Sequence, residues 1–160
     1  MGIILKHILK CLVIAFPMLF VSTSMYAESK DSRISGYRGN LSFSITPEIE
    51  SEVPIGIDIT TSHGYSFGNG WWLGAGIGIM GYHGVIIPIF SEAQYSFTKS
   101  QLSPYVFTKI GHAISVEDGY GCYLSLGFGV CIKSFSVFTS YSKTEIYNLS
   151  NTSIGCSWNF

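Results

Sequence analysis

A strict alternation of side-chain character along most of the chain constrains its fold more than any other feature. In residues 121–132, GCYLSLGFGVCI, every even position is apolar, and the odd positions are mostly glycine or small polar residues. Successive side chains of a β-strand point to opposite faces, so this pattern predicts a strand with two different sides. Eight segments share it: residues 36–46, 54–66, 71–82, 86–98, 104–114, 121–131, 135–143 and 151–160. The sequence therefore predicts an all-β fold.

A glycine-rich stretch at residues 74–81, GAGIGIMG, contains the pattern G-x-G-x-x-G. In a dinucleotide-binding loop this pattern follows a strand and opens a helix. Here it leads into Val85-Ile-Ile-Pro88, a β-branched run that ends in proline. We therefore interpret the glycines as the crowded face of a strand, and we expect no cofactor.

The composition is unusual for a protein that faces water on all sides. Charged residues make up 12% of the chain, against about 25% in an ordinary soluble domain. Part of the surface is therefore expected to meet lipid or a large ligand. The formal net charge of −1 provides no basic field for nucleic acid.

The N-terminal segment has the layout of a secretory signal peptide. Lys6 and Lys10 precede an apolar stretch over residues 11–21, and small residues follow up to Ala27. We expect residues 1–27 to be cleaved as a signal peptide, residues 28–35 to form a short periplasmic lead and residues 36–160 to form the barrel described below. Cleavage after Ser24 and an uncleaved N-terminal anchor helix are the alternatives.

All charged residues within the predicted strands but one share one face. The exception is Lys143 at the end of the seventh segment, which with Glu145 has outside parity and fits only if that strand has left the membrane there. When the apolar residues of each strand define its outer side, the other four charges all fall on the inner side: Arg38, Asp58, Glu92 and Lys109. A Lys or Arg facing lipid at the bilayer midplane costs about 2–4 kcal/mol. The pattern predicts a lumen charge network, with Glu92 and Lys109 as cross-strand neighbours.

Strand length and number indicate the architecture. A tilted membrane strand needs about 9–11 residues, so eight strands use about 72–88, which residues 28–160 supply. We predict an eight-stranded antiparallel transmembrane β-barrel. Side chains fill the bore of a barrel of this size, and no open pore is expected.

The last ten residues, NTSIGCSWNF, end on an aromatic residue and place apolar side chains at alternate positions: Ile154, Cys156, Trp158 and Phe160. This strand resembles the terminal strand of small Gram-negative outer-membrane β-barrel proteins. The resemblance implies export through the periplasm, contact with outer-membrane lipid and assembly by the barrel insertion machinery, which would bind this strand. It implies no single activity, because members include adhesins, scaffolds and lipid-modifying enzymes.

Aromatic residues near the predicted strand ends are expected to form an interfacial girdle, which in transmembrane barrels flanks the apolar band. The residues expected in this girdle are Trp71, Trp72 and Tyr105, together with Trp158.

Catalytic and metal sites are not indicated. His63, His83 and His112 are scattered, and the cysteines expected in the mature chain do not cluster as zinc ligands would. Three readings stay open beside a structural or surface-contact role with an unidentified surface ligand. They are a lipid-modifying enzyme, a secreted lipocalin-like barrel with an apolar interior, and a spanning helix over residues 71–90.

Overall fold

The computed structural model describes residues 35–47, 55–81, 84–98, 100, 102–115 and 119–160. The predicted signal peptide and nearly all of the predicted lead lie outside these residues. The described elements are eight strands and one short 3₁₀ turn: β1 (Gly36–Pro47), β2 (Ile55–Ser66), β3 (Trp71–Gly81), β4 (Val85–Ser96), β5 (Leu102–Ser115), β6 (Gly119–Ile132), β7 (Phe135–Thr144), η1 (Ile146–Asn148) and β8 (Leu149–Asn159).

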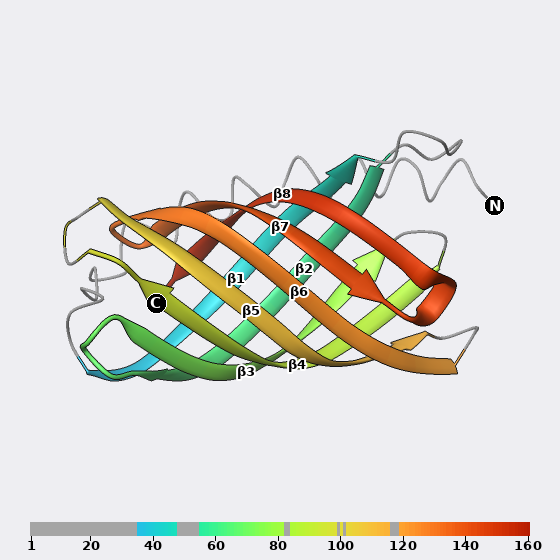
Figure 1. Ribbon diagram of the computed structural model, residues 1–160, viewed down its shortest axis with the longest axis horizontal. Coiled ribbons are helices and arrows are strands. Elements are labelled where there is room, and N and C mark those ends of the chain that lie inside the picture. Colours follow the sequence, from blue (N-terminus) through green and yellow to red (C-terminus); the bar gives the residue numbers. More distant parts are fainter. Residues whose placement is uncertain (1–34, 48–54, 82–83, 99, 101, 116–118) are drawn as a thin grey trace.

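The eight strands form a closed antiparallel barrel in which each strand pairs with its neighbours in sequence. β1 closes the ring by pairing with β8, from Asn40 opposite Asn159 to Ile45 opposite Ile154. Figure 1 shows the strands running obliquely around the barrel. The predicted fold is confirmed.

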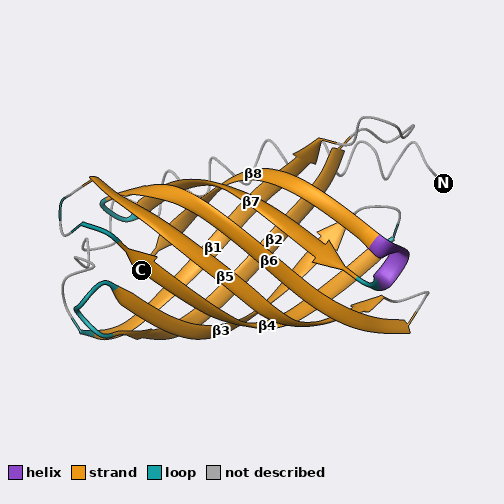
Figure 2. Cartoon of the chain, viewed as in Figure 1, coloured by secondary structure: helices purple, strands orange, loops and turns teal. Residues whose placement is uncertain are grey.

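The two ends of the barrel differ. At the turn end lie the C-terminus and the tight connections β2–β3, β4–β5 and β6–β7, where Gly68, Gly70 and Lys133 adopt positive φ. At the opposite loop end, η1 connects β7 to β8, as the purple segment of Figure 2 shows. These names are used below.

All eight predicted segments are strands, but several boundaries differ. β5 and β6 each span 14 residues and are longer than predicted, and β8 begins before residue 151. Residues 71–81 form β3 and residues 85–90 form the first half of β4, so the spanning-helix alternative is wrong. No helix among the described residues is long and apolar enough to cross a membrane.

Burial alternates along the strands as the sequence predicts. On β6, Tyr123 and Ser125 are buried, whereas Leu124, Leu126 and Phe128 are exposed on the outside. The same alternation puts large aliphatic and aromatic side chains on the outer wall of every strand for which burial is described. This polarity is the reverse of a lipocalin-like barrel, which keeps its apolar face inward around a ligand.

Candidate functional site: the filled lumen

The four charges that sequence analysis assigns to the inner face are all buried within the barrel. Arg38, Asp58, Glu92 and Lys109 are each at most 8% exposed. Glu92 of β4 lies directly opposite Lys109 of β5 in the register, as expected from the hairpin that joins these strands. Arg38 of β1 also lies within electrostatic range of Glu92. The barrel thus encloses two acidic and two basic side chains in its interior.

The Lys109 side chain reaches across the bore. Its Nζ donates a hydrogen bond to Thr60 Oγ1 at 3.2 Å, although β5 and β2 are separated by two intervening strands. Nζ also lies 4.8 Å from the ring centroid of Phe90 and 5.6 Å from that of Phe107. Each ring presents electron density to the cation, which stabilises its charge away from water. One side chain therefore connects opposite walls of the lumen.

Neutral polar groups continue this network toward the turn end and across the closing seam. Asn40 Nδ2 donates to Asn159 Oδ1 at 3.2 Å, and Asn159 Nδ2 donates to Ser136 Oγ at 2.9 Å. The Trp72 indole donates to the backbone carbonyl of Arg38 at 3.3 Å, with the guanidinium 5.8 Å from the indole ring. Buried polar groups need such partners, and these contacts fix the inner surface of β1, β7 and β8.

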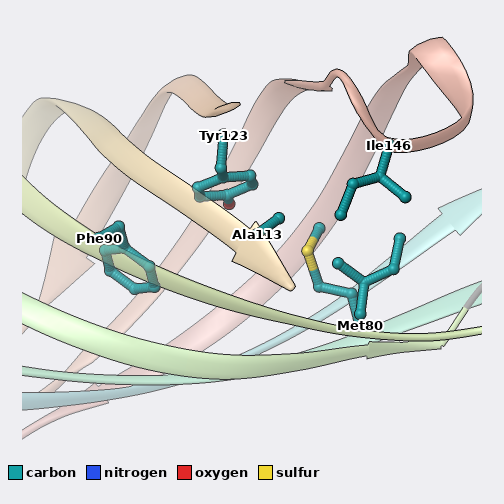
Figure 3. Packing of buried hydrophobic residues seen from close by; sticks show 6 residues of the cluster. Met80, Phe90, Ala113, Tyr123 and Ile146 are labelled. Carbon is teal, nitrogen blue, oxygen red and sulfur yellow. The ribbon is translucent and has the colours of Figure 1, made fainter. Parts of the chain in front are cut away.

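A loop-end apolar layer covers this polar interior on one side. It gathers side chains from β3, β4, β5, β6 and η1: Met80, Ile86, Phe90, Ala113, Tyr123 and Ile146. Figure 3 shows Ile146 pointing from its loop toward the layer that holds Met80 and Ala113. The rings of Phe90 and Tyr123, from strands that are not adjacent, have centroids 5.9 Å apart. Sequence analysis missed Ile146, because its position depends on how the β7–β8 connection folds over the barrel.

A turn-end aromatic layer lies on the other side of the Lys109 ammonium. It consists of Tyr105, Phe107 and Phe138, with Cys131 packed against it. Phe107 of β5 and Phe138 of β7 meet edge to face, with ring centroids 5.5 Å apart, across the intervening strand β6. Aromatic rings therefore lie on both sides of the Lys109 ammonium along the barrel.

The inner glycines explain how a narrow bore holds so many rings. Phe138 lies between Gly129 of β6 and Gly155 of β8 in the register, and a Cβ at Gly155 would approach the Phe138 ring to 2.6 Å. Phe90 lies likewise between Gly76 and Gly111. The G-x-G-x-x-G stretch belongs to strand β3, and its inward glycines make room for aromatic rings. The sequence analysis predicts this crowded face.

The prediction of the aromatic girdle is wrong for two of its residues. Trp72 and Tyr105 are 2% and 4% exposed and lie inside the barrel, whereas Trp71 faces outward. The physical reason is parity: Tyr105 shares its face with Lys109, and Trp72 shares its face with Gly74. The exposed aromatic residues of the turn end are Tyr37, Tyr65, Phe67, Trp71, Phe97 and Phe135, with Tyr95, Trp158 and Phe160 partly exposed.

The residues of the expected terminal signal lie along the closing seam. Ile154, Cys156 and Trp158 are opposite Ile45, Phe43 and Leu41 of β1. Phe160 extends the seam by one step, because its backbone exchanges hydrogen bonds of 2.7 and 3.0 Å with Gly39. Its ring covers the Gly39 backbone and contacts His63 and Trp158.

The two histidines among the described residues lie on different strands and are both exposed. His63 accepts or donates hydrogen bonds with Tyr37 and Thr61 on the outer wall, and His112 lies on a distant strand. Among residues 35–47, 55–81, 84–98, 100, 102–115 and 119–160, no group of His, Cys, Asp or Glu is arranged to hold a metal ion. Cys122, Cys131 and Cys156 are free thiols.

Comparison with known proteins supports the fold alone. No protein-family model matches the sequence, and no curated protein matches it. Among solved structures, the N-terminal β-barrel domain of Pseudomonas aeruginosa OprF is 17% identical, with a TM-score of 0.52 over 78% of this chain and 96% of that domain. The Yersinia pestis outer membrane protein Ail is 11% identical, with a TM-score of 0.51 over 79% of this chain and all of that one. The de novo designed barrel TMB2.3 is 17% identical, with a TM-score of 0.51 over 78% of this chain and 94% of that one. The chain therefore has the fold of small eight-stranded transmembrane barrels.

Proposed function

We propose that this chain is an integral outer-membrane β-barrel protein with a structural or surface-contact role and a side-chain-filled lumen. The observation that carries the proposal is the polarity of the barrel, with an apolar outer wall around an inner network spanned by Lys109 and Thr60. An apolar wall of this extent is stable against acyl chains and costly in water. A bore crossed by hydrogen-bonded side chains leaves no continuous path for ions.

The route to the membrane is part of the same proposal. Residues 1–27 would direct export to the periplasm, and the barrel insertion machinery would bind the last strand through Ile154, Cys156, Trp158 and Phe160. The placement of these side chains on the outer wall at the seam supports this role, because the last strand to be made must join the first. Outer-membrane lipid and an unidentified surface ligand are the other partners.

Membrane insertion can be tested with the adjacent residues Trp71 and Trp72. The Trp71 side chain is 47% exposed, whereas that of Trp72 is 2% exposed. In variants that keep only one tryptophan, brominated lipids are expected to quench Trp71 fluorescence strongly and to leave Trp72 nearly unquenched. The reason is that neighbouring strand residues face lipid and lumen respectively. Equal quenching of both, or quenching of neither, would contradict the proposed placement in the bilayer.

The closed bore can be tested by planar-bilayer recording. The reconstituted wild-type barrel is expected to show no steady conductance, with a water-filled 16-stranded porin as the positive control. The two ring-filled layers and the Lys109 side chain account for this expectation. Stable single-channel openings of the wild type would require a continuous aqueous path and would refute a filled lumen.

A lipid-modifying enzyme is the rival function. Its active site would need a nucleophile and a base in contact on the outer wall, where lipid has access. Incubation of the purified barrel with lipopolysaccharide is expected to leave the mass of the acylated lipid unchanged. Loss of an acyl chain would replace the structural role with a catalytic one.

A further inference from the structure

A row of polar side chains faces outward on β5, β6 and β7 near the loop end. His112 lies opposite Cys122 in the register, and the Glu145 backbone N–H donates to the Cys122 carbonyl at 3.1 Å. Lys143 lies opposite Leu124, one outward position below Cys122. All four polar residues are exposed. Among the described residues, Lys143 and Glu145 are the only charged side chains on the outer wall above the turn end.

The height of this row follows from strand length. A membrane strand needs about 9–11 residues. Counted from the turn end, the eleventh residue of β5 is His112 and the eleventh of β6 is Cys122. The aromatic residues of the turn end, among them Phe135 and Trp71, mark the opposite interface. The polar row therefore lies near the loop-end limit of a spanning strand, with the exposed Ile114 and Tyr120 one outward position beyond it.

The two charged side chains of the row differ in their hydrogen bonding. Glu145 Oε2 accepts a hydrogen bond from the Cys122 backbone N–H at 3.0 Å. That bond, followed by one from the Cys122 thiol, lowers the pKa of the Glu145 carboxyl and keeps it ionised. Within the part of the chain that the structure describes, Lys143 has no hydrogen bond and no ion pair within contact distance. Lys143 and His112 both lie within electrostatic range of the Glu145 carboxylate. Because the Lys143 ammonium makes no direct contact with that carboxylate, it keeps its donors for an anion outside the protein.

We propose that Lys143, assisted by His112, binds the phosphate of a membrane lipid in the leaflet at the loop end, with the acyl chains of that lipid on Ile110 and Leu124. The inference rests on the proposed insertion into a membrane. Ile110 and Leu124 lie opposite each other in the register, one outward position below His112 and Cys122 and level with Lys143, and are 60% and 41% exposed.

A lipid fits this surface better than a soluble anion does. The charged groups and the apolar side chains are continuous on one wall, so a ligand with a phosphate joined to acyl chains contacts both at once. Lysine serves as a point charge for phosphate, and its long stem can lie along apolar surface while the ammonium reaches the headgroup. Free phosphate would use the charge but leave Ile110 and Leu124 to other lipids.

The test compares lipid retention by full-length mature protein in phosphatidylcholine nanodiscs that contain a minor fraction of phosphatidic acid. Native mass spectrometry measures the ratio of phosphatidic acid to phosphatidylcholine retained by the released protein. Lys143→Gln is expected to lower this ratio about fivefold, as for one lysine near an anionic surface. Lys143→Arg should preserve it, because arginine also binds phosphate.

Lys133→Gln is the matched control, since Lys133 is an exposed lysine of the β6–β7 turn at the other end of the barrel. The proposal is overturned if Lys143→Gln keeps the wild-type ratio, or if Lys133→Gln lowers it equally, which would indicate a general charge effect. Displacement of phosphatidic acid by inorganic phosphate at low concentration would assign the site to free phosphate. Failure of Trp71 quenching would instead refute membrane insertion itself.

Discussion

Replacement of Phe138 by alanine is expected to lower the free energy of unfolding by about 3–5 kcal/mol. The ring is flanked by Gly129 on β6 and Gly155 on β8, and glycine has no side chain that could move into the vacated volume. Phe107 would also lose its edge-to-face partner. Because the neighbouring strands are fixed by the closed barrel, collapse around the cavity is limited.

Urea-induced unfolding in lipid vesicles, followed by the heat-dependent gel mobility of the barrel, measures this effect. Phe128→Ala is the control, because Phe128 is 65% exposed on the outer wall and its removal is compensated by lipid. We expect the control to cost much less than Phe138→Ala. Similar losses for both variants would show that Phe138 does not fill a tightly packed lumen.

Replacement of Lys109 by methionine is expected to cost about 3 kcal/mol, even though methionine fills a similar volume. The change removes the cation opposite Glu92 and leaves a buried carboxylate, one of whose oxygens has no hydrogen-bond partner among the described residues. It also removes the donor to Thr60. The cost therefore comes from the charge left behind rather than from lost packing.

The double variant Lys109→Met, Glu92→Gln separates these causes. Since the glutamine carries no charge, it should recover most of the lost stability in the same unfolding assay. Lys133→Met, at an exposed turn position, should leave the midpoint nearly unchanged. If the double variant is less stable than Lys109→Met alone, the interior does not depend on balance between these two charges.

The alternation of apolar and polar residues predicts most of this fold, because it indicates which side of the barrel each side chain faces. The alternation on β6 and the apolar faces of the other strands placed Arg38, Asp58, Glu92 and Lys109 inside without any knowledge of register. The same rule would have placed Trp72 and Tyr105 inside as well. Residue type and nearness to strand ends assign them to the girdle instead, and this weaker criterion is wrong for both.

Other features of the lumen depend on information that alternation does not contain. The contact between Lys109 and Thr60 requires the tilt and stagger of a closed barrel, which bring β2 and β5 to the same height. Ile146 reaches the loop-end apolar layer through a connection whose path is set by tertiary contacts, including the close approach of Gly121 to its backbone. The sequence therefore predicts which way a strand residue faces, but not which distant residue it meets.

The closing seam has a consequence for the order in which the molecule assembles. Asn40 and Asn159 are 119 positions apart in the chain, whereas every other strand pair is joined by one hairpin. Because closing so long a loop carries the largest entropy cost, we expect this pairing to nucleate last, after the hairpins have formed an open sheet. Until then, both edges expose unpaired backbone that could recruit a second copy. We therefore expect the extent of aggregation during folding to depend on the lifetime of the unpaired β1 and β8 edges.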